Sequence, residues 1–497
     1  MSEGKLLPVA NRTESFWLTE RDPELKAART TPDLPSSADV VIIGSGLTGA
    51  MMGYHIMKKA QKEGKQLKVV MLEADECCGS ATARNGGHCK PVTFIGYRSE
   101  AKKHGAAVAN HLLTFEEAAL GLYADVVRKE DIDCDLHVTR AIDVFYRKED
   151  AQSAKLDLEA RAAAFPDATR AGDIRLVEDP KVLEQMAGVT GTAMGASYPA
   201  GHLWPYKLAT SLIRIAIRDG MSIQTYTPAL SMEAAGAKWT VITARGKIAA
   251  GKVIVATNAY TSSVLPEFKP LIIPVRGAAC SITPPPSHSA AGIPGPFRYS
   301  YGFRHAQGQI DYMIPRQGRG RVPGVGDTSL ILGGAKGVYL GHLDRWYNNK
   351  HDNEIIPGTK EYFEGYMSDH FAGWRKGEGS VDHVWSGVLG YSSDLLPLVG
   401  EHPDRPGVYV IAGFTGHGMP RIPGCSDALS TLVLSDSQSA QKTFETALPK
   451  PYWLTRERLE SKTNAIKAAM GQGEGVSAAR ETNDEVNMLA QAVKAKL

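Results

Sequence analysis

Residues 39–50 constrain the fold of this chain more than any other stretch. Residues 40–43 read Val-Val-Ile-Ile, a β-branched run that is typical of a strand buried on both faces. Residues 44–49 follow as Gly-Ser-Gly-Leu-Thr-Gly, which is the spacing G-x-G-x-x-G, and residues 50–59 then indicate a helix. The pattern therefore predicts a strand, a tight turn and a helix that begin a parallel α/β sheet.

Each glycine of this turn has its own physical role. The first allows the tight turn, the second lets backbone N–H groups approach a pyrophosphate, and the third lets the helix pack closely on the strand. A second apolar strand at 67–72 ends in Glu73, 24 positions after Gly49, where an acid would bind a ribose hydroxyl. The polar run 61–66 accommodates the slightly long spacing. We therefore expect a dinucleotide site, with NAD, NADP and FAD all open.

The composition is that of an ordinary globular protein with room for two or three domains. The chain has 497 residues, of which 43% are apolar and 22% charged. Its 56 Lys and Arg against 54 Asp and Glu give a formal net charge of +2. Charge therefore gives no reason to expect nucleic acid or an anionic membrane as a partner. No apolar run approaches the roughly 18 residues that a membrane span needs.

The cysteines and the two ends bear on the compartment. The six cysteines show neither metal-ligand spacing nor regular pairing, and residues 1–12 lack the apolar core of a secretory signal. We therefore expect reduced thiols in an intracellular protein. The chain ends in Ala495-Lys496-Leu497, which is similar to the S-K-L signal bound by the peroxisomal import receptor. A chance basic tail on a cytoplasmic protein is the alternative.

The remaining pattern divides the chain into unlike parts. Residues 1–37 are rich in Pro and Ser and predict an arm lying on the body of the protein. Residues 99–128 predict one long helix, and 198–205 predict a turn-rich passage. Buried apolar strands are expected at 252–256 and 408–412, whereas the stretch between them alternates strands with turns, as in antiparallel sheet.

Four further passages occur in an order that is typical of one enzyme superfamily. Residues 81–88 read Ala-Thr-Ala-Arg-Asn-Gly-Gly-His, and residues 253–260 read Val-Ile-Val-Ala-Thr-Asn-Ala-Tyr. Residues 394–400 read Asp-Leu-Leu-Pro-Leu-Val-Gly, and residues 413–419 read Gly-Phe-Thr-Gly-His-Gly-Met. With the glycine turn, they make the chain resemble the FAD-dependent D-amino-acid oxidase superfamily. The resemblance is to its amine-oxidising branch, which includes glutamylputrescine, sarcosine and glycine oxidases.

The resemblance implies FAD rather than NAD, with non-covalent binding favoured over covalent attachment. It also implies a discontinuous fold. An α/β FAD-binding domain of the Rossmann-like, glutathione-reductase type would be built from 38–95, 196–265 and 385–435. An α+β substrate domain with mainly antiparallel sheet would comprise 96–195 and 266–384, and 436–497 would form a C-terminal extension with a flexible tail.

The resemblance also implies which residues contact FAD. The pyrophosphate would lie against the glycine turn, the ribose against the acid after the second strand, and the flavin between two loops, where N–H donors stabilise negative charge on the reduced ring. The residues are Gly44, Ser45, Gly46, Leu47, Thr48, Gly49, Glu73, Thr82, Arg84, Asn85, Gly86, Gly87, His88, Ala229, Leu230, Ala256, Thr257, Asn258, Gly413, Gly416, His417, Gly418 and Met419.

Candidates for the chemistry follow from the same resemblance. His88 would contact the flavin edge, attach the flavin or act as a base, and the alternative is a structural histidine. Cysteinyl attachment is not expected, because the corresponding position reads Leu389-Gly390-Tyr391. His417 and Tyr391 are further candidates for catalysis, and Lys90 is a candidate for oxygen activation. Arg276 and Arg316 would clamp a carboxylate or serve as ordinary salt-bridge residues. The aromatic residues that would line the pocket or belong to the core are Tyr301, Tyr312 and Trp385.

The expected activity is FAD-dependent oxidation of an amine or amino acid, in particular a secondary or substituted amine, to the imine, with oxygen reduced to hydrogen peroxide. No metal site is expected. One alternative is a flavoenzyme that desaturates or cyclises a biosynthetic intermediate or uses another electron acceptor. A flavin-binding interaction protein is the non-enzymatic alternative. An oxidase that makes peroxide would agree with the peroxisome-like tail.

Overall fold

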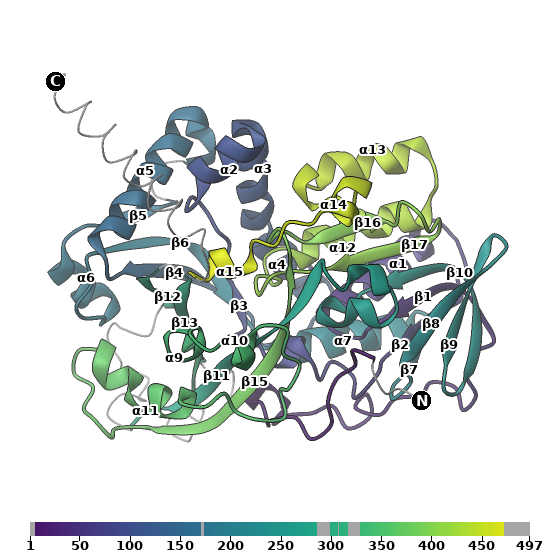
Figure 1. Ribbon diagram of the computed structural model, residues 1–497, viewed down its shortest axis with the longest axis horizontal. Coiled ribbons are helices and arrows are strands. Elements are labelled where there is room, and N and C mark those ends of the chain that lie inside the picture. Colours follow the sequence, from purple (N-terminus) through teal and green to yellow (C-terminus); the bar gives the residue numbers. More distant parts are fainter. Residues whose placement is uncertain (1–4, 170–172, 286–298, 307, 317–328, 472–497) are drawn as a thin grey trace.

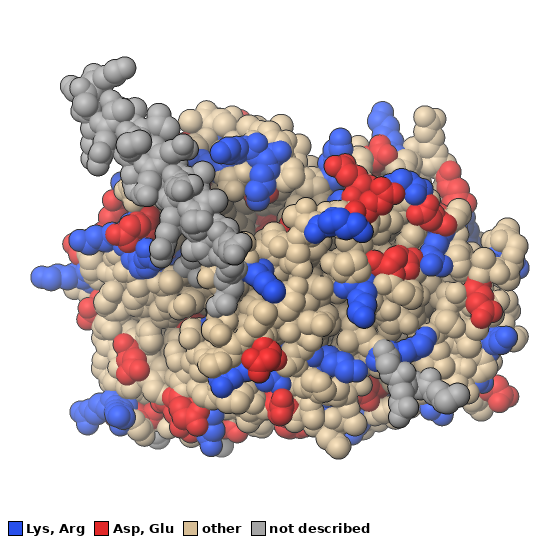
Figure 2. Space-filling view, viewed as in Figure 1, with Lys and Arg blue, Asp and Glu red and all other residues tan. Residues whose placement is uncertain are grey.

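The structure is a computed structural model that describes residues 5–169, 173–285, 299–306, 308–316 and 329–471 (Figure 1). The predicted import signal at 495–497 lies outside these residues. Across the described residues, no helix has the length and apolar character that a membrane span requires. On the face seen in Figure 2, acidic and basic side chains are interspersed, in keeping with the small net charge.

The first sheet gathers segments that are far apart in the sequence. Its central strands run parallel, with β1 between β2 and β10, and β17 beyond β10. Its strands are β1 (Ser37–Ile43), β2 (Val69–Leu72), β7 (Ser222–Gln224), β8 (Ala229–Ala235), β9 (Lys238–Thr243), β10 (Gly246–Val255), β16 (Leu398–Glu401) and β17 (Val408–Ala412). The predicted α/β domain from separated segments is confirmed, since the early, middle and late apolar strands are neighbours.

Apolar helices cover one face of this sheet. α1 (Leu47–Lys62) packs between α7 (Pro205–Arg218) and α12 (Ile422–Leu434). Their buried side chains form one core with inward residues of the sheet such as Ile42 and Ile254. The strand residues that alternate with these, such as Val41, join a second core with β9 on the opposite face.

The second sheet is mainly antiparallel and lies beside the first in Figure 1. One pair, β4 and β12, is parallel. Its strands are β3 (His88–Cys89), β4 (His137–Phe145), β5 (Arg175–Val177), β6 (Met194–His202), β11 (Ile272–Thr283), β12 (Tyr299–Ala306), β13 (Gln309–Pro315), β14 (Leu330–Gly334) and β15 (Ser380–Ser392). The predicted second domain of antiparallel sheet with helices is therefore present.

The other helices surround the two sheets and carry the connections. The α-helices are α2 (Tyr97–His104), α3 (Ala106–Glu117), α4 (Ala119–Lys129), α5 (Lys148–Ala164), α6 (Pro180–Ala187), α9 (Lys336–Tyr339), α10 (Leu343–Trp346), α11 (Thr359–His370), α13 (Gln438–Ala447), α14 (Arg456–Glu460) and α15 (Ile466–Ala469). The 3₁₀ turns include η1 (Phe16–Leu18), η2 (Ala81–Ala83) and η4 (Asn258–Ser263).

Two local predictions were wrong. The single helix expected at 99–128 is three helices, α2, α3 and α4. The first break lies at Gly105, whose φ of +84° is a left-handed conformation that ends α2. The passage 198–205 is not a turn, because β6 extends through His202 and pairs with β4. β6 and residues 385–392 of β15 belong to the second sheet, although residues 196–202 and 385–392 were expected in the FAD-binding domain.

The C-terminal segment connects the two halves of the molecule. Leu454 donates a backbone hydrogen bond to Val399 at the edge of the first sheet. Further on, Ile466 and Met470 join the core of the second sheet. Figure 1 shows this yellow segment running from α14 across the middle of the molecule to α15. The extension is thus part of the packed structure as far as residue 471.

Candidate active site

A cavity of about 550 Å³ opens between the two sheets. Its volume lies within the range of cofactor and small-molecule sites. Ile43, Leu72 and Ala256, at the carboxyl ends of three parallel strands, line one end, and Arg276 and Tyr312 of the second sheet line another part. Ligands of open parallel sheets bind at this edge of the strands.

The glycine turn forms the wall of the first end. Gly44, Gly46, Leu47 and Thr48 line the cavity. Gly44 has φ +106°, and a Cβ there would lie 2.7 Å from the Ala256 carbonyl oxygen. A Cβ at Gly49 would overlap the carbonyl of Gly44, so this glycine packs the helix against the turn, as the spacing predicts.

Glu73 connects the second strand to the glycine turn. Its Oε2 accepts hydrogen bonds from the backbone N–H of Ser45 at 2.9 Å and from the Ser45 hydroxyl at 2.7 Å. Its Oε1 accepts from the N–H of Asp75 at 3.0 Å. An ionised carboxylate has about four acceptor positions. Glu73 therefore keeps capacity for a ligand hydroxyl while it fixes the turn, and Ser45 lies behind the cavity wall.

The segment made of η2 and the loop after it lines the cavity with small residues and is held by its own side chains. The hydroxyl of Thr82 accepts from the N–H of Leu47 at 2.7 Å, which joins this loop to the start of α1. The Asn85 amide donates to the carbonyls of Ala81 and Thr82, and its Oδ1 accepts from Gly87 N at 2.7 Å. Asn85 and Gly86 line the cavity, and Gly87 packs against Leu203 behind them.

Arg84 is bound to the protein rather than left free for a pyrophosphate. Its guanidinium donates to the hydroxyl and carbonyl of Thr13 at 3.1 and 2.7 Å and to the carbonyl of Ser386 at 2.8 Å. The Asp352 carboxylate lies 3.5 Å away. Burial lowers the pKa of Arg84 to about 10. Arg84 therefore joins the loop to the N-terminal arm and to β15, although part of it lines the cavity.

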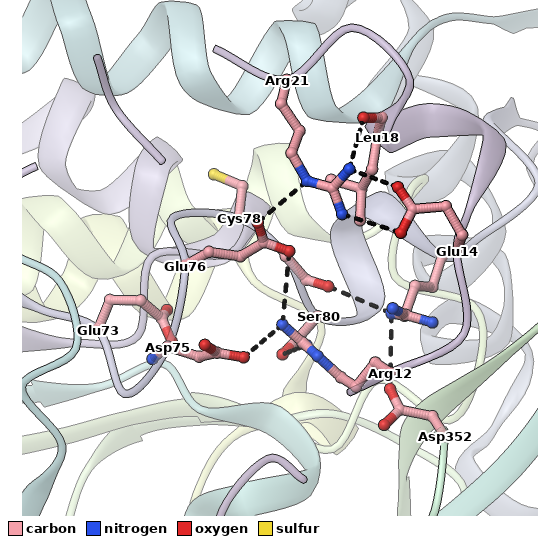
Figure 3. A network of polar contacts seen from close by, with 12 residues as sticks. Arg12, Glu14, Leu18, Arg21, Glu73, Asp75, Glu76, Cys78, Ser80 and Asp352 are labelled. Atoms are coloured by element: carbon pink, nitrogen blue, oxygen red, sulfur yellow. Dashed lines mark hydrogen bonds and ion pairs between the residues drawn. The ribbon is translucent and has the colours of Figure 1, made fainter. Parts of the chain in front are cut away.

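The N-terminal arm covers the same loop from outside. Arg12 contacts Asp75 at 2.6 Å and donates to the Ser80 hydroxyl at 3.0 Å, and its side chain is only 5% exposed. Figure 3 shows Arg12 beside these loop residues, with Arg21 bridging Glu76 and Glu14 next to it. Leu7 and Pro8, which precede Arg12 in the same N-terminal segment, line the cavity.

His88 lines the cavity where the loop enters the second sheet. Its Nδ1 lies 2.8 Å from the Ser300 hydroxyl, and its ring meets Tyr312 edge-on at 5.2 Å between centroids. Its Nε2 is buried and has no hydrogen-bond partner among the described residues. Burial, aided by nearby Lys90, lowers the pKa of His88 well below its ordinary value. The imidazole is therefore neutral at physiological pH.

The second glycine turn follows β17. Gly416, His417, Gly418 and Met419 line the cavity, and Gly413 lies behind them. Asn258 holds the turn, since its Oδ1 accepts from the N–H groups of Gly413 and Phe414 at 3.0 and 3.2 Å. Ala256, Thr257 and Asn258 line the cavity beside it, as does Ala229, whereas Leu230 is not among the lining residues.

Glu116 of α3 fixes the His417 ring. Its two oxygens lie 2.8 Å from His417 Nε2 and 2.7 Å from Arg421 Nε. Burial opposes ionisation of Glu116, but His417 and Arg421 outweigh it and lower the pKa to about 2. The carboxylate is therefore charged at all physiological pH values, and His417 lines the cavity as an oriented ring rather than a freely rotating one.

Three of the proposed chemical residues from the second sheet also reach the cavity. Tyr312 fits over Gly86 and Gly333, at either of which a Cβ would overlap its ring. Tyr391 and Arg276 line the cavity as well. Arg276 forms a 2.9 Å ion pair with Glu354, and its Nε has no partner among the described residues.

Three expected pocket residues lie elsewhere. Tyr301 faces the opposite side of its strand from Ser300 and donates to the carbonyl of Ala187. Trp385 is fully buried and donates to the carbonyl of Arg84 at 3.0 Å. Arg316 stacks on Trp204, pairs with Asp135 at 2.9 Å and lines a separate small recess. The prediction that these three line the substrate pocket was wrong.

The structure adds lining residues that the sequence pattern did not indicate. Arg304 comes from β12, Lys336 is the first residue of α9, and Met470 comes from the C-terminal segment. Arg304 lies four residues after Ser300 in β12, so strand alternation places both side chains on the same face of the sheet. Met470 carried no such signal, because only the fold brings the C-terminal segment to the cavity.

Comparison with known proteins identifies the family. The sequence profile of the DAO family, described as FAD dependent oxidoreductase, matches residues 39–432. The chain belongs to this family. As an FAD-dependent oxidoreductase, it takes FAD as its cofactor, and the prediction of FAD rather than NAD is confirmed.

Relatives of this oxidoreductase are distant but cover most of the chain. A glycine oxidase of Bacillus subtilis is 20% identical, covering 80% of this chain and 93% of its own. A gamma-glutamylputrescine oxidoreductase of Escherichia coli is 24% identical, covering 81% and 85%. Among solved structures, an L-amino acid deaminase from Proteus vulgaris has a TM-score of 0.64 at 15% identity, covering 86% of this chain and 99% of its own.

The residues present fit FAD. The first end of the cavity is lined by the backbone of the glycine turn, which packs so closely on Ala256 that a Cβ at Gly44 would lie 2.7 Å from its carbonyl oxygen, and by the Glu73 carboxylate, which suits a ribose. From there the cavity continues past Asn85 to the unpartnered Nε2 of His88 and to the turn at 416–419. An extended dinucleotide thus has a phosphate cradle at one end and polar groups for a ring at the other.

Proposed function

We propose that this oxidoreductase oxidises an amine or amino acid, in particular a secondary or substituted amine, to the imine. The observation that carries the proposal is the single cavity that runs from the Gly44 cradle to one face of the second sheet, where His88 and Tyr312 meet. FAD bound in the cradle supplies an acceptor for two electrons. The substrate would then lie against the second sheet, beside the flavin end of the cofactor.

The residues at that end favour an uncharged amine. Lys90, Arg304 and Lys336 line this part of the cavity, and nearby positive charges disfavour an ammonium group. Apolar walls such as Val275 and Leu389 limit access of water. A neutral amine has the free electron pair that oxidation of the adjacent C–H bond requires, so the surroundings prepare the substrate for the reaction.

His88 is placed to orient such a substrate. The Ser300 hydroxyl occupies Nδ1, which leaves Nε2 as a hydrogen-bonding atom of a neutral ring. Tyr312 holds the ring edge-on and is itself fixed between two glycines. Rigid support of this kind keeps reacting groups in a productive orientation. The assignments of His88, Tyr391, Arg276 and His417 to the chemistry are part of this proposal.

The distant relatives support amine chemistry. The glycine oxidase is 20% identical to this chain and the gamma-glutamylputrescine oxidoreductase 24%, and each is named for a compound that contains an amine. In the proposed reaction the amine loses two electrons and two protons and becomes an imine, which water hydrolyses. Dioxygen takes up the two electrons and two protons as hydrogen peroxide.

Peroxide yield tests the oxidase part of this proposal. The protein is incubated under air with a panel of primary, secondary and amino-acid amines, and peroxide is measured together with amine consumed. One peroxide per amine is expected. Turnover with near-zero peroxide would instead favour a dehydrogenase that uses another acceptor, or a desaturating or cyclising flavoenzyme. Failure of every amine to reduce the flavin would favour a flavin-binding interaction protein.

Import into peroxisomes is proposed from Ala495-Lys496-Leu497, which lies outside the described residues. A peroxide-forming enzyme would be contained there together with catalase. A fluorescent protein fused to residues 472–497 should enter peroxisomes, and the same fusion without the last three residues should not. Equal distribution of both fusions would remove the proposal without affecting the proposed enzymatic activity.

A further inference from the structure

Met470 of the C-terminal segment lines the cavity, although it lies outside the stretch that matches the family profile. The profile ends at residue 432, and the segment that contains α15 follows it. Met470 belongs to the hydrophobic cluster of the second sheet and is only 7% exposed. The C-terminal segment therefore supplies a part of the cavity wall that the matched stretch does not provide.

The backbone of this segment is held in place on two sides. Before Met470, the Asn464 amide donates to the Tyr347 hydroxyl at 2.8 Å, and Ile466 is fully buried. From the other side, the turn between β12 and β13 packs against the segment, since a Cβ at Gly308 would lie 2.9 Å from the Met470 Cα. The thioether side chain, with its three rotatable bonds, is then the adaptable part of this wall.

Met470 shares its hydrophobic cluster with other residues that line the cavity. These residues form what we call the apolar wall, which consists of Val275, Tyr339, Leu340, Trp346 and Met470. The polar atoms of its two aromatic residues are already paired within the protein. The Tyr339 hydroxyl donates to the Gly334 carbonyl at 3.3 Å, and the Trp346 indole N–H donates to the Leu340 carbonyl at 3.2 Å. The apolar wall therefore offers a ligand hydrophobic contact rather than hydrogen bonds.

A short stretch of chain connects the apolar wall to the place proposed for the amine. Gly333 lies against the Tyr312 ring, which a Cβ there would overlap. Three residues later, Lys336 donates to the Met470 sulfur at 3.8 Å. The Cα atoms of Gly333 and Lys336 are at most about 11 Å apart. A substituent that extends from an amine beside Tyr312 can therefore reach Met470.

We propose that Met470 determines the substrate specificity, because it limits the length of an apolar substituent that the amine carries along the apolar wall. The substrate class is then an amine with an extended hydrocarbon substituent. This inference rests on the proposed function for the amine part alone. Replacement of Met470 by alanine removes the side chain beyond Cβ and opens room for about three methylene groups. Each methylene group that becomes buried there strengthens binding roughly fourfold.

A binding series tests the apolar wall without turnover. Methyl alkyl sulfides have the shape of N-methylalkylamines but no amine to oxidise, and they are titrated into the FAD-loaded protein while the flavin absorption spectrum is followed. The affinity of the wild-type protein should rise roughly fourfold per added carbon up to a preferred chain length and then fall. In Met470→Ala the preferred chain should be about two to three carbons longer. In Met470→Phe, which has the bulkier side chain, it should be shorter.

Met367→Ala is the matched control. Met367 belongs to the same hydrophobic cluster and is 2% exposed, but it is not among the described residues that line the cavity. Its substitution removes the same atoms and should leave the preferred chain length unchanged. An equal shift in Met367→Ala would overturn the role of Met470, as would an unchanged preference in the Met470 variants. Wild-type affinity that does not depend on chain length would overturn the apolar substituent. If Met470→Ala does not fold, Met470→Phe still decides the result.

N-Methylalkylamines of the same chain lengths test the substrate class. Anaerobic reduction of the bound flavin gives the half-saturating concentration of each amine. The chain with the lowest half-saturating concentration should match the preferred sulfide and should lengthen with it in Met470→Ala. An amine preference that stays unchanged in Met470→Ala while the sulfide preference moves would overturn the specificity role. If no amine at all reduces the flavin, the proposed function fails, whereas the sulfide titration still decides the apolar wall.

Discussion

The Arg12 guanidinium lies 2.6 Å from the Asp75 carboxylate, although the two residues are 63 positions apart. Asp75 lies two residues after Glu73 in the loop that enters the cavity, and its N–H donates to the Glu73 carboxylate. The ion pair thus connects the arm to the carboxylate expected to bind the FAD ribose. Trp17 adds a second connection, since its indole N–H donates to the carbonyl of Asn85 at 2.5 Å.

Substitution of Arg12 by Ala should weaken FAD binding. The change removes the contacts to Asp75 and Ser80 and leaves their polar groups without a partner, a loss of about 1–3 kcal/mol for such groups. The dissociation constant of FAD should rise roughly tenfold, which corresponds to about 1.4 kcal/mol. Flavin fluorescence during dilution of the holoenzyme measures it.

Arg214→Ala is the control for this effect. Arg214 also binds the arm, through Asp22 and Glu24, but its side chain is 46% exposed and touches no part of the loop. Exposed ion pairs contribute about 0–1 kcal/mol. The FAD affinity of Arg214→Ala should equal that of the wild-type protein. A comparable loss of FAD in both variants would mean that the arm does not act through the Arg12 contact.

Substitution of Gly44 by Ala should prevent FAD binding. The φ of +106° is strained for alanine, at about 1–3 kcal/mol, and the new Cβ would lie 2.7 Å from the Ala256 oxygen. Gly121→Ala is the control, because this position on α4 has open space and helix geometry. Alanine there should stabilise the protein by about 0.5–1 kcal/mol and leave flavin content unchanged. Normal flavin content in purified Gly44→Ala would contradict the cradle.

The buried His88 should make stability depend on pH below 6.5. Burial holds its pKa well below that ordinary value in the folded protein. Above pH 6.5 neither state binds the proton, so the contribution is intact. Below it the unfolded chain takes up a proton that the folded chain does not, and stability falls by up to about 1.4 kcal/mol per pH unit. Urea unfolding of wild type and His88→Gln between pH 7.5 and 5.5 should show the smaller loss in the variant. Equal losses would mean that His88 is protonated when folded.

Bound FAD should leave the protein on denaturation. Attachment through a cysteine is not expected, because the residues of 388–394 that line the cavity are Val388, Leu389 and Tyr391. Attachment through His88 Nδ1 is not expected either, because the Ser300 hydroxyl contacts that atom. Acid precipitation of the holoenzyme should therefore release all flavin into the supernatant. Flavin that stays with the precipitated protein, on the peptide that contains His88, would show covalent attachment.

The backbone framework of the site could be predicted from sequence, because it depends on local rules. The glycine spacing required one conformation at Gly44, and apolar β-branched runs required buried parallel strands. Glu73 follows from its place at the end of β2, since the carboxyl ends of parallel strands meet at one edge. These features needed no knowledge of distant contacts.

Side chains that depend on the second sheet were predicted less well. Arg84 was expected near the flavin or pyrophosphate, but Thr13 and Ser386, both remote in sequence, hold its guanidinium. Tyr301 was expected in the pocket, but strand alternation turns it to the other face. The contact of Asp143 with Arg304 depends on the pairing of β4 with β12, and no local pattern indicates that pairing.

Anaerobic reduction of the bound flavin by an amine tests the central claim most directly. The holoenzyme is mixed in turn with the primary, secondary and amino-acid amines of the panel in the absence of oxygen, and the visible flavin band is followed. The band should disappear at a rate that increases with amine concentration, and admission of air should restore it with one hydrogen peroxide per flavin. A band that is unchanged by every primary, secondary and amino-acid amine of the panel would contradict amine oxidation by this protein.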